Sequence, residues 1–130
     1  MVELSEDFHT KYITSADTEK PAPNKKYLRL YHHHLCQSSE KARLALAAKA
    51  IPYESYELDL TKKTKWHIAI NEGKVPVLEL LDGTIINDSK IIMEFLEEAY
   101  PDSGAKTLPT DAADRALLRL AIPPIEELGN

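Results

Sequence analysis

The sequence predicts an α/β domain in which a βαβ unit is followed by two strands and a helix (ββα) around a mixed sheet of four strands. Three observations predict this order. Two alternating apolar segments flank an alanine-rich helical pattern in residues 27–60, two apolar runs flank Asp82-Gly83, and an amphipathic helical pattern fills residues 88–100. Strands joined by a helix are normally parallel, whereas strands joined by a tight turn are antiparallel, so the sheet should be mixed.

The βαβ unit begins with a strand expected at residues 27–31, where Leu28 and Leu30 alternate with larger residues. A helix follows at about 38–49, with Ser38 or Ser39 as its N-cap. Its inward positions recur at spacings of three and four, namely Ala42, Ala45, Leu46 and Lys49. After Ile51-Pro52, the second strand is expected at residues 53–60.

The second half begins with a polar connection and a short helix at residues 66–70. Asp82-Gly83 is typical of a two-residue hairpin turn between the next two strands. Pro76 lies at the entrance of the first of these strands because proline cannot donate to the ladder, and a cis bond is possible there. The last helix of the domain starts at Asp88 or Ser89 as its cap and stops at Tyr100-Pro101.

The ends of the chain have weaker patterns. Residues 1–26, which we call the leader, have no sustained period and finish in a proline- and lysine-rich stretch, so we expect an irregular arm. Phe8, Tyr12 and Ile13 could dock this arm on the domain or on another protein. Residues 102–110 are expected to be a linker, and a further helix is expected at 111–120 with an apolar face that includes Leu117, Leu118 and Leu120.

Composition limits the function classes. A chain of 130 residues with a net charge of −5 and 43% hydrophobic residues fits one compact domain with short additions. The acidic balance disfavours nucleic-acid binding, and no apolar run approaches the roughly 20 residues that span a bilayer. A single cysteine and no secretory signal point to the reducing cytoplasm, although membership of an organellar assembly would leave no mark in the sequence.

Cys36, the only cysteine, comes just before the first predicted helix. Unpaired backbone N–H groups and the positive end of the helix dipole favour a thiolate at such a position, although a buried structural thiol is the plain alternative. In an extended loop, His32, His34 and Cys36 could share one side and bind zinc or copper. No further ligand motif completes that set, so we expect no metal.

The order of elements and a series of motifs resemble the thioredoxin-like domain of glutathione transferases, most closely the omega class. The similar motifs are Leu35-Cys36, Glu40-Lys41-Ala42-Arg43-Leu44, Lys62-Lys63-Thr64-Lys65-Trp66, Val75-Pro76-Val77-Leu78-Glu79, Asp88-Ser89, Glu97-Glu98-Ala99-Tyr100-Pro101 and Leu108-Pro109. The resemblance covers about residues 27–120. It implies a glutathione-binding thioredoxin-like domain at 27–101 and the incomplete start of an all-helical domain at 111–130.

The resemblance also implies roles for individual residues. Cys36 matches the cysteine that forms a mixed disulfide with glutathione, and Val75 with Pro76 matches the cis-proline segment whose backbone pairs with the cysteinyl part of the tripeptide. Asp88 and Ser89 match the pair that holds the γ-glutamyl end, and Lys63 matches the lysine that meets the glycyl carboxylate. The sequence departs from the omega pattern after the cysteine, where Gln37 and Ser38 replace a proline and an aromatic residue, and at Asp88, which replaces a glutamate.

Two functions follow as expectations. The first is a glutathione-dependent thiol transferase that uses Cys36 in mixed-disulfide exchange, with glutathione as its cosubstrate. The second is a non-catalytic scaffold derived from a transferase, which forms a homodimer or a larger assembly through the leader and residues 111–130. They differ in whether the chain is an enzyme, and neither requires a metal, a nucleic acid or a membrane.

Overall fold

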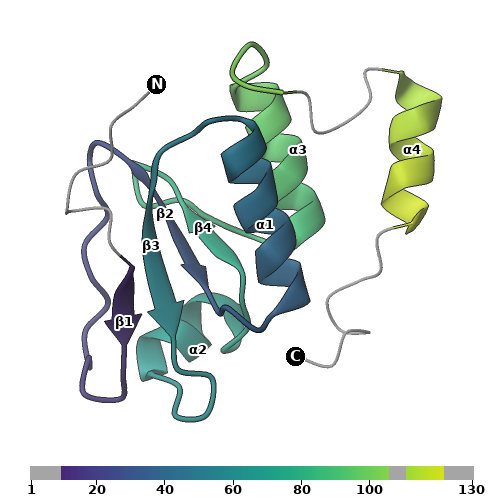
Figure 1. The fold of residues 1–130 in the computed structure, drawn as a ribbon. Helices are drawn as coiled ribbons and strands as arrows, with labels where there is room; N and C mark the ends of the chain where they lie inside the picture. The colour runs from purple at the N-terminus through teal and green to yellow at the C-terminus, as the bar shows by residue number, and fades with distance from the viewer. Residues whose placement is uncertain (1–9, 106–110, 122–130) are drawn as a thin grey trace.

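The computed structural model describes residues 10–105 and 111–121, and in these residues one sheet carries helices on both faces (Figure 1). The strands lie in the order β1-β3-β2-β4-β5. The elements are β1 (Lys11–Ile13), β2 (Leu28–His32), α1 (Gln37–Ala48), β3 (Tyr53–Leu58), α2 (Lys65–Asn71), β4 (Val77–Glu79), β5 (Ile85–Asn87), α3 (Ser89–Ala99) and α4 (Ala112–Ala121). The expectations for Phe8, for residues 106–110 and for residues 122–130 lie outside the described residues.

The predicted βαβ and ββα units are confirmed. Strand β2 pairs in parallel with β3, from Leu28 opposite Tyr53 to His32 opposite Glu57, and α1 makes the crossover. Strand β4 pairs antiparallel with both β2 and β5. The sheet is therefore mixed, and the carboxyl ends of β2 and β3 lie at the same edge.

The leader is not wholly irregular, which corrects the prediction for residues 1–26. Strand β1 pairs in parallel with β3, with Lys11 opposite Tyr56, and so the sheet has five strands rather than four. Three residues are too few to make a recognisable period in the sequence. Contacts with the rest of the domain stabilise this strand: Ile13 is buried, and the indole Nε1 of Trp66 donates to the Asp17 carbonyl at 2.9 Å.

The turn between β4 and β5 is longer than predicted. Leu80 N donates to Thr84 O at 2.9 Å, and Gly83 N donates to Leu80 O at 3.0 Å, so the loop comprises residues 81–83. Gly83 has φ of 91°, in the region that favours glycine, as expected for a three-residue hairpin loop. The predicted two-residue turn is wrong because Asp82-Gly83 occurs in both kinds of loop.

Two apolar layers cover the two faces of the sheet. Helices α1 and α3 cover one face (Figure 1), and the core between them and the sheet contains Leu28, Leu30, Ala42, Ala45, Leu46, Ile51, Leu78, Ile92 and Leu96. On the other face, the leader and α2 contribute to a second core formed by Ile13, Tyr31, Cys36, Tyr56, Leu58, Trp66, Val75 and Val77. Cys36 therefore belongs to the second layer although it starts a helix of the first.

A buried polar network lies beneath the leader. The Arg29 guanidinium donates to Glu54 at 3.0 Å and to Glu79 at 3.2 Å, and the Tyr31 hydroxyl donates to Glu79 at 2.9 Å. Lys20 of the leader forms an ion pair with Glu79. The network connects the leader with β2, β3 and β4, so the leader is held by charge as well as by strand pairing.

The carboxyl-terminal end of α1 is closed by the segment after α3. Ala105 N donates to Ala48 O at 2.8 Å, and the Ser103 hydroxyl donates to Lys49 O at 2.5 Å. Between them, a Cβ on Gly104 would lie 2.2 Å from Ala48 O, so only glycine fits. The fully buried Lys49 side chain, which the sequence pattern placed on the inward face, forms an ion pair at 3.3 Å with Glu97 of α3.

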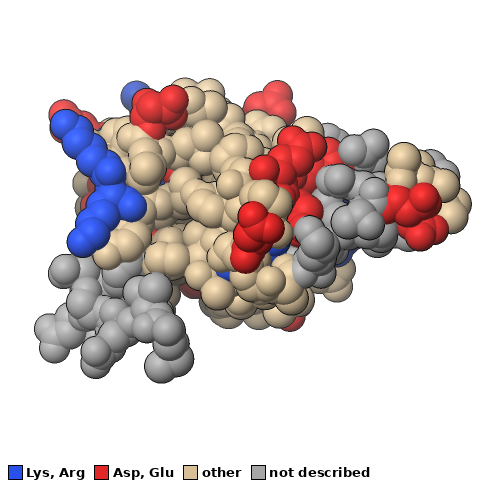
Figure 2. Space-filling model, turned by 90° about the horizontal axis from the view of Figure 1, so that it is seen from above, with Lys and Arg blue, Asp and Glu red and all other residues tan. Residues whose placement is uncertain are grey.

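The surface agrees with the acidic composition. On the face seen in Figure 2, acidic side chains lie at several places, and most of the visible basic side chains form one strip at an edge. Among residues 10–105 and 111–121, no helix is both long enough and apolar enough to cross a bilayer.

Candidate functional site

Cys36 is the N-cap of α1. Its backbone is extended (φ −86°, ψ 121°), and its sulfur accepts the Ser39 N–H at 3.4 Å. The predicted caps, Ser38 and Ser39, instead lie buried inside the first turn. The helix starts early because Cys36 N donates to His33 O at 3.1 Å and closes a turn directly before it. The thiol is thus fixed at the positive end of the helix with 6% of the residue exposed.

The segment before β4 lies against this thiol. The Cys36 sulfur is 3.9 Å from the Val75 carbonyl oxygen, and the Val75-Pro76 peptide bond is cis. The preceding residue, Lys74, has its carbonyl fixed by two donors of α2, His67 Nε2 at 2.8 Å and Asn71 Nδ2 at 3.1 Å. Burial lowers the pKa of His67, so the ring stays neutral and keeps the Nε2 proton that it donates.

The start of α3 directly follows β5, the strand that pairs with β4. Asp88 is the N-cap and accepts the Lys90 N–H at 2.9 Å, while Ser89 is buried in the first turn, so the predicted cap is confirmed. Just before it, Asn87 is paired with Val77 and donates its amide to Asn71 at 2.9 Å. Asp88 and the Pro76 segment are therefore linked through α2.

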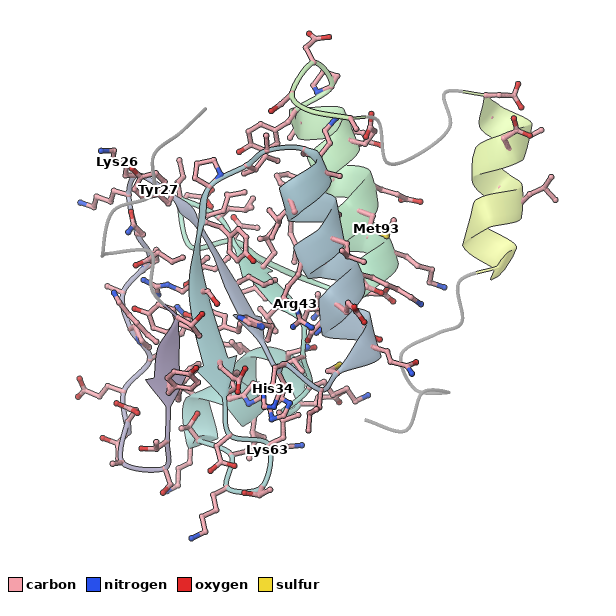
Figure 3. The ribbon with its side chains drawn as sticks, in the orientation of Figure 1. Lys26, Tyr27, His34, Arg43, Lys63 and Met93 are labelled. Atoms are coloured by element: carbon pink, nitrogen blue, oxygen red, sulfur yellow. The ribbon has the colours of Figure 1, made fainter. Side chains whose placement is uncertain are left out.

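The Lys63 side chain lies over Gly73, close to the Val75-Pro76 segment. A Cβ on Gly73 would lie 2.7 Å from Lys63 Cδ and 3.3 Å from its Nζ, so the absence of a side chain lets the lysine lie on the backbone two residues before Val75. Figure 3 shows Lys63 and His34 at the same end of the sheet, where β2 and β3 finish. The lysine is exposed, and its ammonium group is accessible to a ligand carboxylate.

Arg43 is a residue whose role sequence reasoning missed. From the second turn of α1, its guanidinium donates to His33 O at 3.0 Å, to His34 O at 3.4 Å and to His32 Nδ1 at 3.0 Å. These bonds hold the loop that leads to Cys36. The sequence did contain a signal for this role. Arg43 is a long basic side chain in the first two turns of the predicted helix, and the carbonyl groups of the loop before that helix need hydrogen-bond donors.

The histidines do not form the metal set considered from the sequence. His32 is buried, and while Nδ1 accepts from Arg43, Nε2 donates to the Ser55 hydroxyl at 2.5 Å. Burial, with a smaller contribution from the charge of Arg43, lowers the pKa of His32 to about 4. Both nitrogens of His32 are thus engaged, and the Cys36 sulfur contacts Ser39 and Val75, so neither residue joins His34 in a metal site.

Of the expected residues, the structure brings Cys36, Val75 and Lys63 to one segment, whereas Asp88 and Ser89 are connected with it through β5 and Asn71. Cys36 contacts Val75 directly, Lys63 lies over the backbone of the same segment, and the α3 start with Asp88 and Ser89 follows the strand paired with β4. A thiol, an exposed ammonium group and a second helix start with donor N–H groups suit a small peptide that carries sulfur and carboxylates.

Comparisons with known proteins agree with this arrangement. Residues 30–104 match the family model described as glutathione S-transferase, N-terminal domain. The chain is 34% identical over 105 residues to glutathione S-transferase omega-1 of Sus scrofa, an alignment that covers 75% of the chain and 43% of the relative.

Solved structures give the same result. Glutathione transferase Omega 3C from Trametes versicolor is 33% identical with a TM-score of 0.62, over 82% of this chain and 46% of that one. A glutathione transferase homolog from sulfitobacter with bound glutathione is 30% identical with a TM-score of 0.64, over 73% and 46% of the two chains. The fold is thus the thioredoxin-like one, and the chain spans less than half the length of these relatives.

Proposed function

The chain belongs to the family of the glutathione S-transferase N-terminal domain, and from this premise we propose that it binds glutathione and exchanges disulfides through Cys36. The observation that carries the proposal is the position of the thiol. Its sulfur lies at the N-cap of α1 and 3.9 Å from the carbonyl of Val75, the residue before the cis-proline. The family membership supplies the ligand, and the sulfur at the helix start supplies the chemistry.

The reaction needs two exchanges. The Cys36 thiolate attacks the glutathionyl sulfur of a mixed disulfide, a Cys36–glutathione disulfide forms, and the other thiol leaves as a thiolate that takes up a proton. A second glutathione thiolate then attacks the glutathionyl sulfur on Cys36. This step releases oxidised glutathione and restores the Cys36 thiolate, so each mixed disulfide is reduced by one added molecule of glutathione, and the other half of the oxidised glutathione comes from the substrate.

The surrounding residues bind and orient the tripeptide in this proposal. The backbone of Val75 and Pro76 receives its cysteinyl part, the first turn of α3 with Asp88 and Ser89 receives the γ-glutamyl end, and Lys63 pairs with the glycyl carboxylate. Three features support these roles: the Cys36 contact with Val75, the Asp88 cap and the Lys63 contact with Gly73.

The test of the chemistry is a mass measurement. We expect incubation with oxidised glutathione to add one glutathionyl group to the chain and reduced glutathione to remove it. Cys36→Ser should add none and should lose thiol-transfer activity entirely, while its circular dichroism stays that of the parent. A native protein that remains unmodified, or a Cys36→Ser protein that gains the same mass, contradicts the proposal.

The test of binding uses retention on immobilised glutathione. Asp88→Ala should lose retention because a carboxylate that helps to hold the γ-glutamyl end is gone. Asp59→Asn is the matched control. Asp59 is a partly exposed loop residue that accepts the Thr61 N–H, and an amide oxygen can do the same, so retention should be unchanged. Equal retention of all three proteins would remove Asp88 from the site.

A second function, a transferase-derived scaffold, is favoured by one observation. Leu117 of α4 is 64% exposed, and an apolar side chain on a surface helix suits contact with a partner chain. In this function, the leader and residues 111–130 join a homodimer or a larger assembly, and Cys36 is structural. No retention on glutathione together with a native mass well above that of one chain would favour the scaffold over the enzyme.

A further inference from the structure

Two histidines and a glutamate meet beside the loop that leads to Cys36. His33, His34 and Glu57 each offer one ligand atom, and these atoms lie within 4.8 Å of one another. We propose that they bind a zinc ion. The site is separate from the sulfur and from the glutathione chemistry, and it does not depend on the proposed function.

Backbone pairing places the three residues together. Glu57 lies opposite His32 in the parallel register of β2 and β3. His33 and His34, the two residues after His32, therefore lie next to the Glu57 side chain. The His34 N–H donates to Glu57 Oε1 at 3.1 Å, and its ring Nδ1 lies 2.7 Å from Oε2. Arg43 holds the carbonyls of both His33 and His34, so the ligands are carried by a fixed loop.

The histidines can present nitrogen lone pairs. His34 Nδ1 and Glu57 Oε2 face each other at 2.7 Å, so in the tautomer of His34 that carries its proton on Nε2, the Nδ1 lone pair and the carboxylate can bind the same ion. The lone pair of His33 Nδ1 accepts the Leu35 N–H at 3.1 Å, and zinc would replace that single bond. The two rings are already stacked with centroids 4.6 Å apart, so small side-chain rotations bring both to one ion.

A cavity adjoins the cluster. It has a volume of about 250 Å³, lies where β1, β2 and β3 end, and is lined by His33 and Glu57 together with Tyr12, Thr14 and Asp59. A cavity of this size holds several water molecules, because one water needs only about 30 Å³ of liquid volume. The protein ligands would therefore leave at least one position of the ion for water.

The donor set selects the class of metal. Two imidazole nitrogens and one carboxylate oxygen suit zinc, whereas calcium and magnesium prefer oxygen ligands throughout. Cys36 is not part of the set because its sulfur accepts the Ser39 N–H and lies against Val75. This separates the site from the His32, His34 and Cys36 combination considered from the sequence.

The experiment is a titration of the full chain, produced without a histidine tag, with zinc in competition with a chromophoric chelator. We expect one equivalent to bind. His34→Gln and Glu57→Gln should each weaken binding at least about tenfold, since even loss of an outer contact to a metal ligand costs that much. Asp59→Asn, which changes a carboxylate of the same cavity outside the cluster, should bind as the parent does.

Cobalt gives an independent readout of the ligands. The cobalt-loaded protein should show visible d–d bands without a sulfur-to-metal charge-transfer band, and Cys36→Ser should give the same spectrum and the same zinc affinity. Three outcomes overturn the proposal: no saturable zinc binding, undiminished affinity in both Gln variants, or a charge-transfer band that disappears in Cys36→Ser. None of them bears on glutathione addition, so the two proposals fail separately.

Discussion

Helices α1 and α3 lie side by side on one face of the sheet, but their first turns are capped differently. In α3 the cap is a carboxylate, Asp88, which accepts the Lys90 N–H at 2.9 Å. In α1 the cap is a sulfur, Cys36, which accepts the Ser39 N–H at 3.4 Å, and sulfur is a weak acceptor. The loop before α1 is held instead by Arg43, from within the helix.

The difference shows that a helix start can be fixed without a strong acceptor at its cap. At α3 one residue both caps the helix and is the expected ligand contact. At α1 the two tasks are divided, because Arg43 holds the backbone carbonyls of His33 and His34 and is itself bonded to His32, so the thiol is not needed to hold the loop. Stability should therefore depend on Arg43 and His32 at the first helix start, and on Asp88 itself at the second.

The largest expected effect is the pH dependence that comes from His32. Its pKa of about 4 lies below the ordinary value of 6.5, so between these pH values the unfolded chain binds a proton that the folded chain does not. The contribution of His32 to stability should be constant above pH 6.5 and should fall by about 3 kcal/mol as the pH drops to about 4.

The measurement is urea unfolding at several pH values in parent and His32→Asn proteins. The variant should be less stable at neutral pH but should lose that part of the acid sensitivity. His67, whose pKa burial also lowers, acts in the same direction and is present in both proteins, so the difference between the two curves isolates His32. Parallel curves would place the acid sensitivity elsewhere.

The next effect concerns Arg43. Arg43→Ala removes three hydrogen bonds that hold the loop before Cys36, and it should lower the free energy of unfolding by about 2 kcal/mol. Arg43→Lys keeps the charge but cannot reach three acceptors in a fork, and it should recover less than half of the loss. Chemical denaturation provides both values. A loss no larger than that of Cys36→Ser would show that the sulfur, not the guanidinium, fixes this helix start.

The smallest effect is expected at Asp88. Asp88→Ala should cost about 1 kcal/mol through the lost cap, whereas Asp88→Asn should be nearly neutral because asparagine caps equally well and tolerates the positive φ of 74°. Thermal unfolding measures both. If Asp88→Asn keeps stability but loses retention on glutathione, the carboxylate charge has a role beyond the cap, and equal retention would make Asp88 structural only.

Much of the fold followed from the sequence because its signals are local and strong. The alternation at Leu28 and Leu30 and the amphipathic pattern up to Tyr100-Pro101 each extend over several residues, so both elements were predicted with their correct partners. The cis bond before Pro76 could be named as possible but not decided, since the isomer depends on the surrounding fold.

The missed features depend on contacts between distant residues. Strand β1 is stabilised by two contacts: Ile13 is buried in the second core, and the Asp17 carbonyl accepts a hydrogen bond from Trp66. No pattern in residues 1–26 reveals either contact. The sequence predicts the wrong cap for α1 because serine is a usual N-cap and cysteine is not. In the structure, the turn in which Cys36 N donates to His33 O outweighs this preference for serine. Arg43 belongs to a motif of the family resemblance, but the groups that accept its hydrogen bonds come within reach only when the loop is folded.

The polar network beneath the leader has a consequence for how the molecule opens. Two lysines of the leader pair with its carboxylates, Lys11 with Glu54 and Lys20 with Glu79. Without the leader, the only cation paired with these two carboxylates among the described residues is Arg29. Detaching the leader would leave one buried carboxylate uncompensated, which costs several kcal/mol. The leader from β1 to Lys20 should therefore belong to the same cooperative unit as the central strands, and its amide hydrogens should exchange in the same opening event rather than as those of a frayed end.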